Sequence, residues 1–233
     1  MTGTIFALVL TLGAYAAAAA VWQRCGRHPL LNPTLFAIAG VATALLALNM
    51  QHADYFASAE LVHALLGPAV VALAVPLYRH AAVLRARAGA LLMALVLGSA
   101  TAVLVGVAVA VALNVSAGAV LSLAPRSATT AVSMGVAAEI GGIPALTAVL
   151  TIATGITGAV LGGWILDAMG VRDPLARGFA LGTASHGIAT ARAFQDGEAA
   201  GIAAGLAMGL NAILTAVIAP PLARLLLSFG GGS

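Results

Sequence analysis

Long apolar runs, separated by short polar stretches, follow one another along almost the whole chain. A helix needs roughly 20 predominantly apolar residues to cross a bilayer. The pattern therefore predicts an all-α, polytopic membrane protein of about seven transmembrane helices, built as one integral membrane domain over residues 1–233. The expected spans are residues 4–22, 33–50, 59–78, 89–113, 143–168, 176–194 and 199–227.

Residues that break helices interrupt this pattern at three places. Proline removes a backbone donor and clashes with the preceding turn, and glycine weakens a helix interior. An apolar run at 115–124, about half a membrane thickness long at ~1.5 Å per residue, precedes the second interruption. The expected breaks are at Gly67, Pro68, Pro125 and Gly187.

The distribution of charges suggests how the chain crosses the membrane. Arginines in short loops favour the cytoplasmic side. All the loop arginines lie on the cytoplasmic side only if residues 115–141 enter the membrane, turn near Pro125 and Arg126, and return to the side from which they entered. A full crossing of this stretch is the alternative, and it would place Arg224 outside. We therefore expect one re-entrant hairpin in addition to the spans, with the N-terminus outside and the C-terminus in the cytoplasm. The arginines expected inside are Arg24, Arg27, Arg79, Arg85, Arg87 and Arg224.

A weak internal similarity points to an inverted repeat with interrupted helices. The segment PTLFAIAGVATALLAL from Pro33 is similar to PALTAVLTIATGITGAV from Pro144, and PAVVALA from Pro68 loosely matches SHGIATA from Ser185. Inverted repeats with broken helices near the bilayer midplane are typical of secondary transporters. We expect repeat one at residues 30–113, the re-entrant stretch at 114–142 and repeat two at 143–227.

Composition excludes several classes of protein. Hydrophobic residues make up 62% of the chain and charged residues only 7%, which no water-soluble domain of this size could carry. The few basic residues are all arginine and lie between apolar runs, so we expect no nucleic-acid partner. Cys25 is the single cysteine and excludes a disulfide framework. Residues 4–22 are expected to be a retained span, not a signal peptide. No catalytic set, cofactor motif or metal-ligand cluster is visible, so we expect no enzyme.

The polar segment that begins at Pro125 supplies the strongest candidate site. An ionisable residue inside a membrane span indicates function by default, and an arginine can donate a forked pair of hydrogen bonds to a carboxylate. His186 changes protonation near physiological pH and is a candidate for proton coupling, as is Glu139. The expected substrate-binding residues are Arg126, Ser127, Thr129, Thr130, Ser185, His186, Arg192 and Asn211.

Several of these residues also have a purely structural interpretation. Hydroxyl groups in a membrane helix commonly bond to the carbonyl of the preceding turn. Arg192 could extend to the membrane surface, Glu139 could end the hairpin near water, and His63 could pack between helices. Glycines such as Gly155 and Gly158 favour close helix packing over binding.

Three strings resemble a known family: LAPRSATTAVSMGVAAEIGGIPALTAV, ARGFALGTASHGIATARAF and GLAMGLNAILTAVIAP. They are similar to the LrgB/CidB family of bacterial inner-membrane proteins, which is related to plastid glycolate/glycerate transporters. The similarity is strongest at 121–220, and GPAVVALAVPLYRH from Gly67 also fits. Many members read PKSVTT where this chain has PRSATT, so Arg126 keeps the charge but changes its shape.

The resemblance implies two classes of function. Plant relatives carry small hydroxyacids, and some bacterial members are associated with pyruvate. The family is also named for modulation of murein hydrolase activity and autolysis together with a holin-like LrgA/CidA-type membrane protein. We expect a proton-coupled carrier of small monocarboxylates in the bacterial inner membrane, a homo-oligomer in contact with lipid. A regulator or pore component that acts with the holin-like partner is the alternative.

Overall fold

The computed structural model describes residues 2–26, 31–65, 68 and 74–229, and every regular element in these ranges is a helix. Its contacts divide into two units, Met1–Pro76 and Leu77–Ser233. Within the described residues, four helices are long and apolar enough to cross a membrane: Gly3–Arg24, Ala88–Ala112, Pro144–Ala168 and Glu198–Ser228. The predicted all-α class is therefore confirmed, and the chain has the helices of a multi-pass membrane protein.

The first unit begins with two apolar helices, α1 (Thr2–Arg24) and α2 (Pro33–Ala47). Helix α1 matches the expected span at 4–22, whereas α2 has 15 residues and covers only part of the expected span at 33–50. Asn32 starts α2, because its side-chain oxygen accepts the backbone N–H groups of Thr34 and Leu35 at 2.9 and 3.2 Å. The short helices α3 (His52–Ser58) and α4 (Glu60–Ala64) follow. The hydroxyls of Thr11 and Tyr55 share a hydrogen bond of 2.6 Å that ties α1 to α3.

The expected third span is not a single helix in the described residues. After α4, the next described helices are α6 (Ala74–Arg79), which crosses the boundary between the units, and α7 (Ala81–Ala86). Gly67 and residues 69–73 lie outside the described residues, and Pro68 stands between them. The predicted break at Gly67 and Pro68 therefore stays a prediction.

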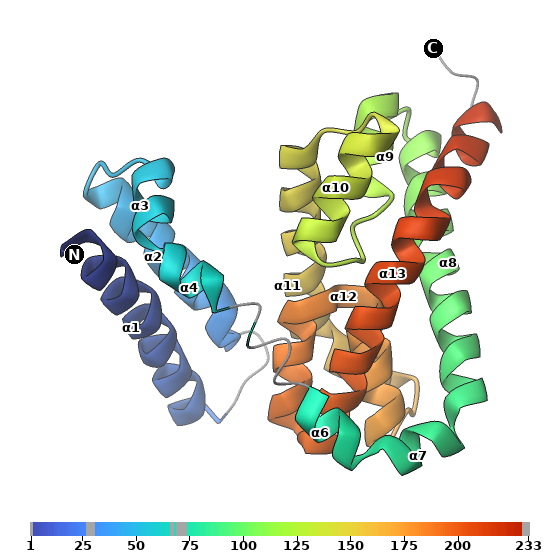
Figure 1. Cartoon of the computed structure of the whole chain (residues 1–233), viewed down its shortest axis with the longest axis horizontal. Coiled ribbons are helices and arrows are strands. Elements are labelled where there is room, and N and C mark those ends of the chain that lie inside the picture. The colour runs from blue at the N-terminus through green and yellow to red at the C-terminus, as the bar shows by residue number, and fades with distance from the viewer. Residues whose placement is uncertain (1, 27–30, 66–67, 69–73, 230–233) are drawn as a thin grey trace. The chain divides into compact units, whose positions relative to one another are not determined.

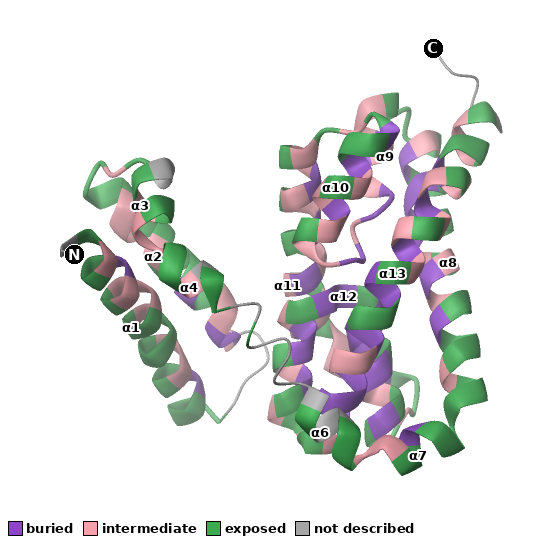
Figure 2. Ribbon diagram, viewed as in Figure 1, coloured by how far each residue is buried: buried purple, intermediate pink, exposed green. Residues whose placement is uncertain are grey.

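Two long helices of the second unit, α8 (Ala88–Ala112) and α13 (Glu198–Phe229), run side by side in the same direction (Figure 1). Near their starts, Leu95 of α8 shares a core cluster with Ala203 and Ala207 of α13. Near their ends, Val107 shares another with Ala219. Figure 2 shows buried residues where these helices face their neighbours. Large apolar side chains such as Leu92 and Val217 are exposed on the outside, as expected where lipid is the solvent.

A first helical hairpin lies between α8 and the next long helix. Its arms are α9 (Ala117–Leu123) and α10 (Thr130–Ile140). Near the tip, Ser133 Oγ donates to Pro125 O at 2.6 Å; at the other end of α10, Ile143 N donates to Ser122 Oγ at 2.7 Å. The two arms are therefore antiparallel. The chain turns where the sequence pattern placed a turn, at Pro125 and Arg126.

The helix α11 (Pro144–Ala168) runs in the opposite direction to α8 and leads to α12 (Pro174–Asp196). Gly178 and Phe194 of α12 both contact the first turns of α13, at Ala200 and Gly201 respectively. A straight helix would separate Gly178 and Phe194 by about 24 Å. Both contacts are possible only because α12 folds back on itself.

The fold-back occurs at two residues with non-helical backbone, Ser185 (φ −143°, ψ 24°) and His186 (φ 42°, ψ −139°). Ala189, in the returning arm, accordingly shares a core cluster with Leu181 of the outgoing arm. We name residues 174–196 the second hairpin and residues 117–140 the first hairpin. The helix is broken near Gly187, as expected. The expectation that residues 176–194 form a span is wrong, because the chain returns to the end from which it came.

This fold-back also determines which arginines share an end of the second unit. Three end-to-end helices, α8, α11 and α13, separate Arg87 from the C-terminal end of α13. Arg87 and Arg224 consequently lie at opposite ends of the second unit, and the expectation that they share a side is wrong. Asp196 and Glu198 lie at the end that carries Arg87.

Candidate functional site

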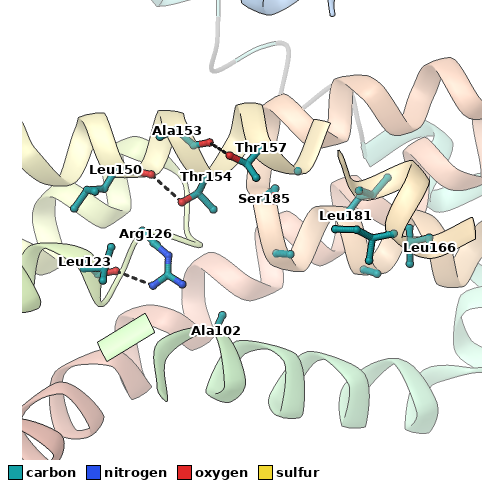
Figure 3. A pocket seen from close by; sticks show the side chains of 15 residues that line it. Ala102, Leu123, Arg126, Leu150, Ala153, Thr154, Thr157, Leu166, Leu181 and Ser185 are labelled. Atoms are coloured by element: carbon teal, nitrogen blue, oxygen red, sulfur yellow. Dashed lines mark hydrogen bonds between the residues drawn. The ribbon is translucent and has the colours of Figure 1, made fainter. Parts of the chain in front are cut away.

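The tips of the two hairpins border a cavity of about 610 Å³ in the second unit. The first hairpin contributes Leu123 and Arg126, and the second contributes Ala184 and Ser185. Helix α8 contributes Ala102, and α11 forms one wall (Figure 3). Most of the lining is alanine, leucine and glycine, so the few polar groups determine what the cavity can bind.

Arg126 is the charged group of this cavity. Its Nη1 donates to Leu123 O at 3.4 Å, a long bond, and no carboxylate pairs with it in the described part of the chain. Gly106 of α8 makes room for it, since a Cβ at that position would overlap the guanidinium. A charge removed from water without a partner is costly. Its position favours binding of an anion from the cavity.

Two threonines of α11, Thr154 and Thr157, are the hydroxyl residues that line the cavity beside Ser185. Each donates its hydrogen to a backbone carbonyl four residues earlier, at Leu150 and Ala153, with distances of 2.8 Å. Their oxygens remain able to accept a hydrogen bond. Neither residue was predicted from the sequence. The available signal was that Thr154, Thr157 and Gly158 are three and four residues apart and therefore share one helix face.

The hydroxyl residues of the first tip do not line the cavity. Ser127, Thr129 and Thr130 are not among the lining residues. Ser127 Oγ is buried and has no hydrogen-bond partner in the described residues. Thr129 precedes the first turn of α10 without capping it through its side chain. Because α10 begins at this tip, its positive dipole end is directed toward the middle of the unit, which favours an anion there.

Ser185 and His186 form the second tip, but only Ser185 lines the cavity. The ring of His186 is buried against α11, where its Nε2 is 2.8 Å from Thr151 O. Because a carbonyl only accepts, Nε2 carries the hydrogen and donates it. Gly155 provides the space for the ring, since a Cβ there would lie 2.6 Å from Cε1 of His186. One hydrogen bond thus fixes the tip to α11, and the absence of a side chain at Gly155 lets the ring of His186 pack there.

Asn211 of α13 holds the first tip in place. Its Nδ2 donates to Ser127 O at 2.9 Å. Its Oδ1 accepts hydrogen bonds from Ser99 Oγ of α8 and from Thr215 Oγ1, the latter at 3.3 Å. The side chain is completely buried and does not line the cavity. These hydrogen bonds connect α8, α13 and the first hairpin.

We expect Asn211→Ala to lower the thermal stability of the protein. The substitution leaves Ser127 O and the Ser99 hydroxyl buried without their partner, at a cost of about 1–3 kcal/mol. Unfolding followed by fluorescence-detected size exclusion in detergent measures the effect. Ser228→Ala is the control, because Ser228 is exposed and bonds only to Leu225 O. An unchanged melting temperature for Asn211→Ala would show that the hydrogen bonds of Asn211 do not stabilise the fold.

Two other predicted residues are not brought to the cavity. Arg192 lies on the returning arm of the second hairpin, where its Nη1 pairs with Asp196 Oδ1 at 3.0 Å. Glu139 is exposed in the last turn of α10, at the end of that arm opposite the tip. Their predicted roles in substrate binding and proton coupling stay predictions.

An ion pair at the end of the unit joins α8 to the second hairpin. Arg87 Nη1 lies 2.5 Å from Asp173 Oδ2, and Asp173 also caps α12 by accepting Ala176 N at 3.0 Å. The hydrogen bond from Arg87 lowers the pKa of the Asp173 carboxyl below its ordinary value. A lowered pKa in the folded state contributes stability above the unfolded pKa, and this contribution is lost as the pH falls.

We expect a small, pH-dependent difference in stability between wild type and Asp173→Asn. Asparagine still caps the helix, so the comparison isolates the charge. The wild-type advantage should be present at pH 7 and shrink below about pH 4, near the ordinary pKa of aspartate. Melting temperatures of both proteins from pH 7 to pH 3 test this. A constant difference would show that the ion pair does not contribute.

Comparisons with known proteins agree with the earlier resemblance. The family model described as LrgB-like family matches residues 11–225. Two Bacillus subtilis proteins, named "Uncharacterized protein YxaC" and "Uncharacterized protein YwbG", are 33% and 36% identical to this chain. Their alignments cover 84% and 82% of this chain and 85% and 84% of the relatives.

A Bacillus cereus protein named "Antiholin-like protein LrgB" is 31% identical over 83% of this chain and 84% of its own length. No solved structure matches the chain. The family model covers nearly all of the sequence, including both hairpins and the cavity between them. The chain therefore belongs to the LrgB-like family.

Proposed function

We propose that this membrane protein is a secondary transporter of small monocarboxylates. The single observation that carries the proposal is Arg126, which lies without a carboxylate partner in a cavity between two hairpin tips. Among the described residues, the lining of this cavity contains one cation and no acidic residue, which suits a ligand with a single negative charge. A forked guanidinium suits a carboxylate. The oxygens of Thr154 and Thr157 can accept from a hydroxyl group of the substrate, which favours hydroxyacids such as glycolate and glycerate.

The arrangement of the helices supports a carrier. Helix α8 followed by the first hairpin, and α11 followed by the second hairpin, are the same order of elements in opposite orientation. In a membrane both hairpins would be re-entrant, with their broken ends near the midplane, as in transporters with inverted repeats. Irregular backbone is tolerated at that depth only where it is buried in protein or lines a cavity.

The orientation of the second unit follows from its arginines. One end carries Arg79, Arg85, Arg87, Arg172 and Arg177, whereas the other carries Arg224. Arginine-rich loops face the cytoplasm. We propose on this ground that the loop between α11 and α12 faces the cytoplasm and the C-terminal end of α13 lies outside, in the bacterial inner membrane.

Proton coupling is part of the proposal and depends on His186. Its ring adjoins Ser185 of the cavity wall, and its hydrogen bond to Thr151 O fixes the position of the second tip. A change in the protonation of this ring would alter the charge next to the bound anion. Transport would then require one proton with each carboxylate.

The printed name of the Bacillus cereus relative, antiholin-like, favours a second candidate. In that case the chain would regulate envelope lysis together with a holin-like membrane partner, as a pore component or a non-transporting subunit. Apolar walls around a single charged group suit a carrier better than a continuous aqueous pore. The two functions are compatible, because movement of weak acids changes membrane energisation.

Uptake into vesicles tests the proposal. Purified protein is reconstituted, and labelled glycolate, glycerate, pyruvate and lactate are supplied with and without an inward proton gradient. Saturable, gradient-dependent uptake of one acid supports the carrier. Uptake only when a holin-like partner is added supports a two-component carrier. Leakage of unrelated solutes in place of saturable uptake supports the pore.

A further inference from the structure

A second cavity, of about 470 Å³, lies between the first half of α8 and the outgoing arm of the second hairpin. Arg87 is at its outer end, where the ion pair with Asp173 is formed. Apart from Thr183, the remaining lining is apolar and mostly small, with Ala94 and Gly98 on α8 facing residues of α12. This cavity therefore resembles the first one in having a single cation among small apolar side chains.

One face of α8 connects the two cavities. Arg87, Leu91, Ala94 and Gly98 line the second cavity, and Ala102 lines the first. Their spacing of three and four residues places them on one side of the helix. One turn beyond Ala102, Gly106 contacts the guanidinium of Arg126. A single stripe of mainly small residues thus extends from Arg87 to Arg126.

The second hairpin forms the opposite wall of both cavities. Ala180 and Ala184 line the first cavity on one side and the second cavity on the other. Gly98 and Thr183 both line the second cavity and pack closely against each other, since a Cβ at position 98 would be 3.3 Å from Cγ2 of Thr183. A larger side chain at position 98 would collide with Thr183.

We infer that the second cavity is an entrance site for the same monocarboxylate, which binds at Arg87 and then passes along the small residues of α8, past Gly98, to Arg126. This inference depends on the proposed carrier function. It assigns the substrate a second binding site, at the cytoplasmic end of the unit.

The ion pair at the entrance suits this role. The side chains of Arg87 and Asp173 are 51% and 41% exposed, and ion pairs with such exposure contribute little to stability. An arriving carboxylate can therefore replace Asp173 as the partner of Arg87 at low cost. When the site is empty, Asp173 neutralises Arg87 and joins the second hairpin to α8.

Thiol labelling tests the path without requiring transport. In a Cys25→Ser background, Ala94→Cys reports on the entrance and Ala102→Cys on the inner cavity. The protein is held in lipid nanodiscs so that lipid covers its sides. The probes are a negatively charged and a positively charged methanethiosulfonate reagent of similar size, and the rate of modification is measured by mass spectrometry.

The inference predicts two results. First, Gly98→Leu should reduce modification of the Ala102→Cys variant to near background and leave that of the Ala94→Cys variant unchanged. Gly89→Leu, on the same helix with no atom near its Cβ, should change neither. Second, Arg87→Gln should slow the anionic reagent at Ala94→Cys by about tenfold, without slowing the cationic one.

Unchanged labelling of the Ala102→Cys variant in the presence of Gly98→Leu would overturn the inference, as would equal effects of Arg87→Gln on both reagents. These outcomes are separate from the carrier proposal. Saturable uptake together with a labelling pattern that differs from the two predicted results would support the carrier and contradict this path. The predicted labelling pattern without any uptake would support a path for anions and contradict the carrier.

Discussion

Arg126→Ala is expected to abolish uptake while the protein still inserts, folds and migrates as a single species. The guanidinium is the charged group of the inner cavity, and it has no carboxylate partner among the described residues. Hydrogen bonds to charged groups contribute about 1.5–3 kcal/mol each, so loss of a forked pair weakens binding by roughly a hundredfold or more. Folding should be maintained, because removal of an unpaired, half-buried charge also removes its desolvation cost. Uptake of the acid that gives the highest wild-type rate is the measurement.

Three further variants make this result specific. Arg126→Lys keeps the charge but loses the planar fork, so we expect weakened uptake between the wild-type and alanine rates. Gly106→Val keeps the arginine but displaces its guanidinium, and should also reduce uptake. Arg224→Ala is the matched control, since Arg224 is exposed near the C-terminal end of α13. Normal uptake by Arg126→Ala would remove the site assignment.

Gly182→Ala is expected to destabilise the second unit. The outgoing arm of the second hairpin packs backbone to backbone on α13, and a Cβ at position 182 would overlap the carbonyl oxygen of Ala204. A backbone atom cannot rotate away as the end of a side chain can. The two helices must therefore separate, at a cost of about 1–3 kcal/mol or more. The melting temperature in detergent measures the loss.

Gly209→Ala provides the matched control for this packing. Gly209 lies in α13, and no atom lies within 4 Å of the Cβ that alanine would add. Alanine there should be neutral or stabilise by up to about 1 kcal/mol, because it restricts the unfolded chain. Equal melting temperatures for Gly182→Ala and Gly209→Ala would contradict the close contact between the second hairpin and α13.

The apolar pattern predicted the long helices well and the second hairpin poorly. Helices α1, α8, α11 and α13 begin and end close to the expected runs, because a membrane helix needs a length that is readable from composition. The run at 176–194 is also long enough to cross. Whether a broken helix continues or returns depends on contacts with α13, which run length does not encode. The closely packed Gly178 and Gly182, four residues apart, were the signal that could have indicated those contacts.

The candidate site was predicted in part. Arg126 and Ser185 both line the cavity, as expected from a charge and a helix break in apolar sequence. Thr154 and Thr157 were missed, because threonines in helices commonly only bond to the preceding turn, as these two also do. Arg192 was included although Asp196 follows it by four residues, a spacing that favours an ion pair on one helix face.

The backbone of His186 has an energetic consequence for the second tip. Its φ of 42° lies in a region that costs a residue with a side chain on the order of 1–3 kcal/mol. The hydrogen bond from its ring to Thr151 O contributes about 1 kcal/mol in return. Such strain persists only where the surrounding structure holds it in place, and here the His186 side chain is buried and its ring packs against Gly155 of α11. The second tip therefore stores conformational strain, and loss of its contacts with α11 would favour a less strained backbone at this position.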